Sequence, residues 1–93
     1  MELSVIEQAL AGGLYRFTDH AQEQMGRRQL AEADVRLALA SPDEILPVRA
    51  GRVVVHAMLK TYLLRVFIDV EPQPMEVVTA YRTSKIDRYR SQP

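Results

Sequence analysis

The sequence predicts an α+β domain in which two to three N-terminal helices pack on a four-stranded antiparallel sheet. Three observations support this fold class. Apolar residues recur at helical spacing in residues 3–42, apolar and polar residues then alternate as they do in strands, and short turn segments separate the alternating stretches. The 93 residues are enough for a single domain at 1–93. We expect its helical part at 3–42, the sheet at 43–82 and a basic tail at 83–93.

The end signals of two helices stand near the N-terminus. Ser4 and Glu7 fit a capping box at the start of the first helix, and a pair of glycines supplies its stop. Thr18 is the expected N-cap of the second helix, with Asp19 in the first turn, where the helix dipole favours a negative charge. Both helices are therefore expected to be short.

A third helix and four strands complete the predicted order. The helix is expected at residues 32–40, because Ser41-Pro42 does not continue it. The expected strands are 44–48, 52–60, 61–70 and 76–82. Pro47 indicates an edge position for the first of them, and Ser84 is expected to cap a final helical turn.

Alternation within the strands assigns the side chains to two faces. From Tyr62 to Val70 every second residue is hydrophobic, so this face is expected to lie under the helices. The opposite face carries His56, Lys60 and Arg65. We therefore expect a functional site on the face of the sheet that the helices leave bare.

Charge is distributed unevenly along the chain. Twelve Lys and Arg balance twelve Asp and Glu overall. Residues 1–47 hold four basic and eight acidic residues, a formal charge of −4, whereas residues 48–93 hold eight basic and four acidic residues, a formal charge of +4. A net charge of zero therefore leaves room for a local phosphate-binding surface among the strands and the tail.

Other function classes are excluded by what the sequence lacks. The chain has no cysteine, which excludes disulfides and thiol catalysis, and only two histidines. No carboxylate cluster stands at metal-ligand spacing, so we expect no metal and no cofactor. The longest apolar run contains too many polar residues to cross a bilayer, and the N-terminus does not read as a secretory signal. A cytoplasmic protein is expected.

Two segments of the chain, 17–45 and 77–89, resemble the uncharacterised bacterial family called domain of unknown function 4258. The residues that carry the resemblance are His20-Ala21, Met25, Arg28, Pro42 and Thr79-Ala80-Tyr81. The chain departs from the family pattern at Gln24, where the family often has an arginine. This departure removes one candidate phosphate ligand.

The order of elements and the C-terminal Lys-x-x-Arg-Tyr sequence are also similar to RelE-like and BrnT-like toxin ribonucleases. This resemblance implies a RelE/barnase-like fold and metal-independent RNA cleavage, in which a ribose 2′-hydroxyl attacks the adjacent phosphate. It further implies a small antitoxin protein as a partner. The basic segment of these toxins corresponds here to Arg82, Lys85, Arg88 and Tyr89.

Such cleavage needs a base, an acid and cations that stabilise the charge on the phosphate. His20 and His56 are candidates for the proton transfers because imidazole titrates near neutral pH, and a tyrosine can donate a proton or stack on a base. The candidate catalytic residues are His20, His56, Tyr81 and Arg82. The candidate RNA-binding and phosphate-binding residues are Arg28, Arg65, Lys85, Arg88 and Tyr89.

Structural roles are open for the same residues. His56 fits a cross-strand pair, Arg28 an ion pair with Glu32 one helical turn on, and Tyr81 a packed strand aromatic. The alternative function is a non-catalytic binding module on the same fold. A third hypothesis is a homodimer formed through the face at Leu63–Phe67.

The cleavage hypothesis depends on one arrangement of side chains. His56, Arg65 and Arg82 must open onto a shared hollow on the bare face of the sheet, because the imidazole and the guanidinium groups have to reach the same phosphate.

Overall fold

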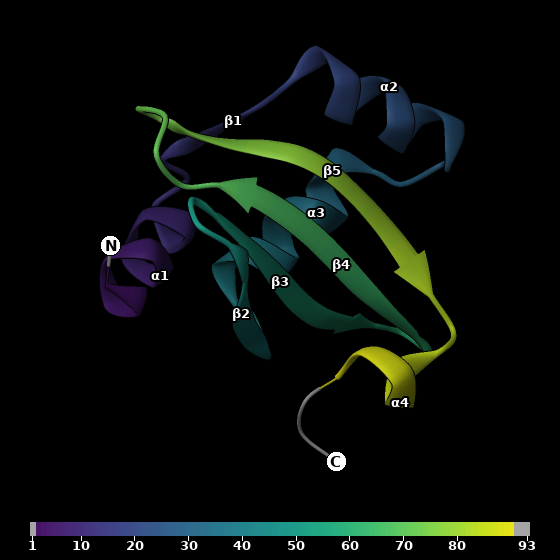
Figure 1. Cartoon of the computed structure of the whole chain (residues 1–93). Coiled ribbons are helices and arrows are strands. Elements are labelled where there is room, and N and C mark those ends of the chain that lie inside the picture. Colours follow the sequence, from purple (N-terminus) through teal and green to yellow (C-terminus); the bar gives the residue numbers. More distant parts are fainter. Residues whose placement is uncertain (1, 91–93) are drawn as a thin grey trace.

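One mixed β-sheet organises the computed structural model, which describes residues 2–90. The elements in chain order are α1 (Leu3–Ala11), β1 (Tyr15–Phe17), α2 (Asp19–Arg27), α3 (Glu32–Ala40), β2 (Glu44–Arg49), β3 (Arg52–Leu59), β4 (Tyr62–Asp69), β5 (Met75–Thr83) and α4 (Ile86–Tyr89). The strand order is β1-β5-β4-β3-β2 (Figure 1). The predicted α+β class is confirmed.

The sheet has a fifth strand, β1, that the sequence analysis does not predict. β1 pairs in parallel with β5, from Tyr15 opposite Met75 to Phe17 opposite Val77, while the other strand pairs are antiparallel. The prediction of a four-stranded antiparallel sheet is therefore wrong in strand number and direction. Three residues are too few to show a strand period, and their partner lies far along the chain.

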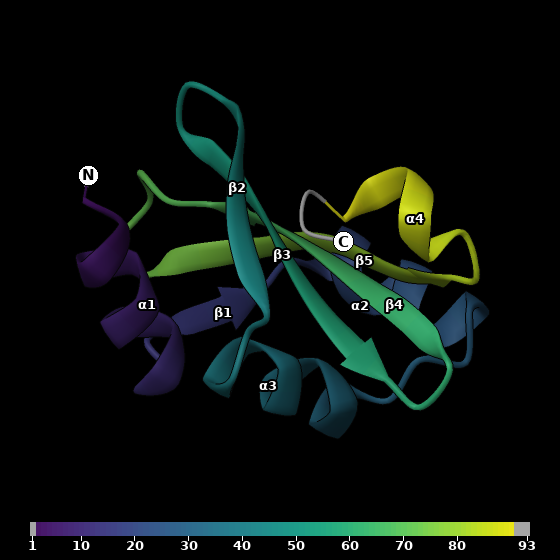
Figure 2. The same ribbon diagram turned by 90° about the horizontal axis from the view of Figure 1, so that it is seen from below.

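The first three helices lie on one side of the sheet. α3 packs against β3 and β4, α1 packs against α3, and α2 runs beside β5 (Figures 1 and 2). Leu64, Val66 and Ile68 of β4 have no exposed surface and belong to the core under the helices. The hydrophobic face predicted from the alternation of β4 is thus confirmed.

Local end signals explain most helix boundaries, with two corrections. The hydroxyl of Thr18 accepts from the backbone N–H of Ala21 at 3.0 Å, so the predicted cap of α2 is confirmed. α3 has the predicted bounds. The capping box at Ser4 and Glu7 is wrong, because α1 begins at Leu3 and Ser4 lies inside its first turn. Ser84 is not the cap of α4 either, since that position is held by Lys85.

The edge and the turn beside it follow the sequence. β2 ends the strand order, as Pro47 predicts. The turn at Ala50-Gly51 requires glycine, because Gly51 has φ +81° and a Cβ there would lie 2.7 Å from the Glu71 carboxylate. β2 and β3 are joined by this turn.

The second face of the sheet is not covered by α1, α2 or α3. α4 lies on this side, opposite to α3, and follows directly from β5 (Figure 2). Leu63, which points to this face, has no exposed surface within a single chain. It therefore has no surface to offer to the dimer expected through Leu63–Phe67. Residues 91–93 of the predicted basic tail lie outside the described residues.

Within residues 2–90, no helix combines the length and the apolar composition needed to span a bilayer.

Candidate functional site

Four side chains from four neighbouring strands form a continuous hydrogen-bonded chain on the face opposite α3. They are Glu44 of β2, His56 of β3, Arg65 of β4 and Tyr81 of β5. Each stands directly opposite the next in the strand register. The sheet therefore brings together residues that are well separated in the sequence, and we refer to these four as the cross-strand chain.

The hydrogen bonds of the cross-strand chain have defined directions. Arg65 donates from Nε to His56 Nε2 at 3.0 Å and from Nη1 to the Tyr81 hydroxyl. Because a guanidinium only donates, Nε2 of His56 must accept and the ring proton must be on Nδ1. Nδ1 lies 2.6 Å from Glu44 Oε2, so the imidazole donates to this carboxylate.

His56 is a buried link rather than an accessible acid or base. Its side chain is 1% exposed, and both ring nitrogens are engaged within the cross-strand chain. The cross-strand pairing considered for this histidine is what the structure shows. An imidazole in this position cannot touch an external phosphate.

Arg82 does not share a hollow with His56 and Arg65, contrary to the arrangement expected from the sequence. A β-bulge is the reason. Phe67 stands opposite Thr79, but Ile68 stands opposite Val77, so β5 has one extra residue at this point. An extra residue exchanges the two faces for all that follows. Tyr81 thereby joins the cross-strand chain.

A different hollow, of about 510 Å³, is lined by Arg28, Tyr81 and Arg82. It lies where the end of α2 meets β5, beyond the three residues of β5 that pair with β1. We refer to it as the arginine hollow. Among the described residues, its lining carries two guanidinium groups and no carboxylate.

Arg28 joins the two segments that carry the family resemblance. Its Nη1 donates to the carbonyl of Ala80 at 3.0 Å and to the hydroxyl of Thr79 at 3.2 Å. Its guanidinium carbon lies 5.8 Å from the centroid of the Tyr81 ring. Arg28 does not pair with Glu32, which binds Arg36 at 2.9 Å instead. Its positive charge is therefore left for the hollow.

Arg82 connects the same hollow to the end of α2. It donates to the carbonyl of Arg28 at 3.0 Å and, at the longer distance of 3.4 Å, to that of Gln29. The last carbonyls of a helix lack partners and carry partial negative charge, so a guanidinium here stabilises the helix end. Arg82 is exposed and forms no ion pair among the described residues.

Tyr81 lines the hollow, and its hydroxyl group has a defined place in the cross-strand chain. Because its oxygen accepts from Arg65, its own proton remains free to be donated. The ring stacks on Phe67 with centroids 6.3 Å apart and an interplanar angle of 17°. The hollow is therefore lined by two guanidinium groups and by a tyrosine whose hydroxyl proton is not donated within the described residues, a set that suits a phosphate group.

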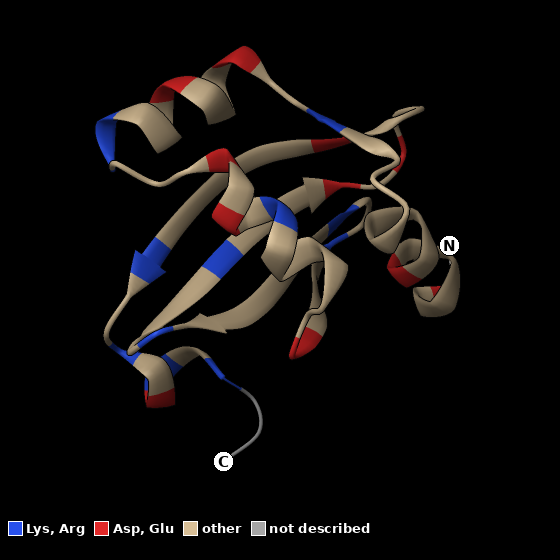
Figure 3. Ribbon diagram, turned by 180° about the vertical axis from the view of Figure 1, so that it is seen from behind, with Lys and Arg blue, Asp and Glu red and all other residues tan. Residues whose placement is uncertain are grey.

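α4 encloses the guanidinium of Arg65 from the open side of the sheet. The guanidinium carbon lies 4.0 Å from the Tyr89 ring centroid and 5.2 Å from that of Phe67. Lys85 and Arg88 are exposed at the same end of the molecule. Figure 3 shows Lys and Arg segments gathered at the end of α2, at the end of β5 and around α4. The guanidinium of Arg65, which was predicted to bind phosphate, is thus covered by aromatic rings.

His20 is the predicted site residue that the fold separates from the others. It is exposed in the first turn of α2, whereas the hollow lies beyond the last turn of that helix. The residue that sequence reasoning missed is Glu44, whose only signal is its place on the strand next to His56.

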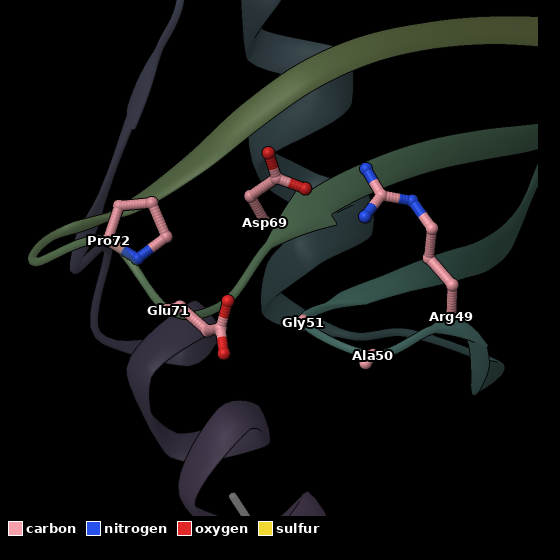
Figure 4. A pocket seen from close by; sticks show the side chains of 6 residues that line it. All are labelled: Arg49, Ala50, Gly51, Asp69, Glu71 and Pro72. Atoms are coloured by element: carbon pink, nitrogen blue, oxygen red, sulfur yellow. The ribbon is translucent and has the colours of Figure 1, made fainter.

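A second hollow, of about 360 Å³, has mixed charge. It is lined by Arg49, Ala50, Gly51, Asp69, Glu71 and Pro72 (Figure 4). Arg49 points toward Asp69, and Asp69 binds Arg52 with both carboxylate oxygens, at 2.7 and 3.1 Å. Its lining carries two carboxylates and one guanidinium, so it does not suit an anion.

The fold and the site define a small α+β protein with a cationic hollow at the free edge of its last strand. The chain belongs to the family described as Domain of unknown function (DUF4258), which matches residues 17–84. No curated protein and no solved structure matches the chain. The matched segment contains all three residues of the arginine hollow and excludes α1 and α4. The similarity to RelE-like and BrnT-like toxins is not confirmed.

Proposed function

We propose that the chain binds single-stranded RNA, with a backbone phosphate held in the arginine hollow. The observation that carries this proposal is that the guanidinium groups of Arg28 and Arg82 line one hollow together with Tyr81, whose hydroxyl oxygen accepts from Arg65. Guanidinium groups bind phosphate oxygens through paired N–H donors, and a neutral hydroxyl adds a third donor without further charge.

The surroundings of the hollow favour an extended polyanion over a single small phosphate. Lys85 and Arg88 are exposed beyond the end of β5 and continue the positive surface. The Tyr89 ring centroid lies 5.5 Å from the guanidinium carbon of Arg88, and Tyr81 lines the hollow itself. Cations that track a phosphate backbone, interleaved with aromatic rings, are typical of surfaces that bind single strands.

Binding without cleavage is the function that the geometry supports best. General base catalysis needs a group within hydrogen-bond reach of the 2′-hydroxyl. His56 is buried and engaged, and His20 lies at the far end of α2 from the hollow. Among the described residues, no imidazole lines the hollow.

Metal-independent RNA cleavage is the second candidate, favoured by the free proton on Tyr81 beside two cations. In this reaction the 2′-oxygen bonds to phosphorus and gives its proton to water, and the bond from phosphorus to the 5′-oxygen breaks. That oxygen takes the Tyr81 proton, which water restores. The products are a 2′,3′-cyclic phosphate and a 5′-hydroxyl. Under this candidate the chain is a toxin relative with a small antitoxin partner.

The test measures the affinity of the full chain for a short labelled RNA by fluorescence anisotropy, at several salt concentrations. Arg28→Ala is expected to weaken binding about tenfold and to reduce the salt slope by about 0.7 for the lost phosphate contact. Arg27→Ala is the matched control, because Arg27 is the adjacent arginine and is paired with Glu23. It should leave the affinity within about twofold.

Two outcomes overturn the binding proposal. One is a folded wild-type chain with no measurable affinity for RNA at low salt, and the other is equal affinity of the two alanine variants. DNA of the same sequence distinguishes RNA recognition from general binding of single strands. Gel analysis of the same RNA decides the second candidate, since cleavage requires new products in wild type that Tyr81→Phe reduces.

A further inference from the structure

We infer that Glu44 and His56 are positioning residues for the arginine hollow: they orient Arg65, and through it keep the Tyr81 hydroxyl proton free for the bound phosphate. This inference rests on the proposed function. Neither residue lines the hollow, and the two act through the hydrogen bonds of the cross-strand chain.

The first step is the orientation of Arg65. Aromatic rings of Phe67 and Tyr89 lie against its guanidinium and restrict its plane. They do not supply an acceptor for its N–H groups. His56 Nε2 does so at 3.0 Å from Nε, and this bond directs Nη1 to the Tyr81 hydroxyl. Without the acceptor, a partly buried N–H would lose its partner, and the guanidinium would turn toward another.

The second step is the proton position on His56. A neutral imidazole carries its proton on either nitrogen, and the neighbouring hydrogen bond selects which. The Glu44 carboxylate only accepts, and at 2.6 Å from Nδ1 it selects the form with the proton on Nδ1. With the proton on Nε2, two N–H donors would face each other between His56 and Arg65.

The third step is the consequence at Tyr81. If Arg65 no longer donates to its oxygen, the hydroxyl is free to rotate and to donate elsewhere. The hydroxyl then has to be ordered again when phosphate binds. When Arg65 already donates to the Tyr81 oxygen, the hydroxyl is ordered before phosphate binds and this entropy cost is avoided. Glu44 and His56 therefore influence the ligand only through Tyr81.

The experiment is a double-mutant cycle on RNA affinity. His56→Leu removes both hydrogen bonds of the ring at similar volume, whereas His56→Gln keeps an N–H for Glu44 and a carbonyl acceptor for Arg65. We expect His56→Leu to weaken binding about three- to tenfold, as Tyr81→Phe does, and His56→Gln to stay within about twofold of wild type. In the Tyr81→Phe background, His56→Leu should have no further effect.

A structural readout that needs no RNA accompanies the cycle. The ¹⁵N spectrum of His56 is expected to show the proton on Nδ1 in wild type. Glu44→Gln should admit the other form, because an amide both donates and accepts. This variant also tests the inference if His56→Leu does not fold. Circular dichroism establishes which variants are folded at the temperature of the binding assay.

The outcomes separate the two proposals. If RNA binding depends on Arg28 but the effects of His56→Leu and Tyr81→Phe add, the positioning role is overturned and the binding function stands. A ring proton on Nε2 in wild type also overturns the positioning role. If wild type binds no RNA, the proposed function fails, whereas the spectrum still decides how the cross-strand chain is protonated.

Discussion

The guanidinium carbon of Arg28 lies 5.8 Å from the centroid of the Tyr81 ring, and the same guanidinium donates to the backbone carbonyl of Ala80 at 3.0 Å. Arg28 follows the last turn of α2 and Tyr81 stands in β5. The relationship joins the two ends of the segment that the family shares, residues 17–84. Short motifs that are far apart in the sequence therefore form one place on the surface.

Arg28→Lys tests whether the shape of this side chain matters as well as its charge. Lysine keeps the positive charge but lacks the planar fork that binds Ala80, Thr79 and a phosphate together. We expect RNA affinity to fall about three- to tenfold, with a smaller change in salt slope than Arg28→Ala causes. Anisotropy titrations at several salt concentrations measure both. Unchanged RNA affinity would show that Arg28 contributes only its positive charge.

Thr18→Ala removes the N-cap of α2, the helix whose end carries Arg28. The Thr18 hydroxyl accepts from Ala21 N at 3.0 Å, and loss of such a cap costs about 1 kcal/mol of unfolding free energy. Urea unfolding followed by circular dichroism measures the change. Thr18→Ser keeps the acceptor and is the matched control. A serine variant as unstable as the alanine variant would show that the hydroxyl is not responsible.

Asp69→Asn tests the ion pair between Arg52 of β3 and Asp69 of β4. The hydrogen bonds and the positive charge of Arg52 lower the pKa of Asp69 from its ordinary value. Because the folded-state pKa lies below that of the unfolded chain, the carboxylate stabilises the fold above its ordinary pKa. This stabilisation is lost as the pH falls through the folded-state pKa.

The variant should therefore lose less stability than wild type between about pH 7 and about pH 3, by about 0.5–1 kcal/mol for a partly exposed pair. Urea unfolding at a series of pH values measures this difference. Glu71→Gln is the control, because Glu71 is an exposed carboxylate beyond the end of β4. Parallel pH curves for Asp69→Asn and wild type would contradict the role of the pair.

Lys60→Gly is expected to stabilise the protein. Lys60 stands in the turn between β3 and β4 with φ +57°, a conformation that costs energy for residues with a Cβ. Glycine should raise the unfolding free energy by about 0.5–1 kcal/mol. Lys60→Ala retains the Cβ and should give no such gain. Equal stability of the two variants would assign the effect to the lost lysine side chain.

Local sequence patterns determined the start of α2, the bounds of α3 and the faces of β3 and β4. Thr18 caps α2, and the sequence at Ser41-Pro42 ends α3, because these signals act on the nearest backbone groups. The alternation in β3 and β4 placed His56 and Arg65 on one face, since side chains in a strand alternate with a period of two. These assignments needed no contact from elsewhere in the chain.

The strand register could not be predicted in this way, because it depends on both strands of a hydrogen-bonded pair. Shifting one strand by two residues would keep every face and change every partner, so no alternation pattern could place Glu44 opposite His56 or Arg65 opposite Tyr81. β1 was hidden for the same reason, since its identity as a strand depends on its partner β5.

What the sequence by itself determined about this protein is its class, the start of α2, the bounds of α3 and the two faces of its central strands. Only the tertiary structure decided which arginine side chains line the same hollow. One extra residue in β5, opposite Phe67 and Ile68, turned Tyr81 toward Arg65 and Arg82 toward the end of α2. The physical reason is that a bulge sets two residues of one strand opposite one residue of its partner, so it is a property of the strand pair and re-aims the side chains that follow it.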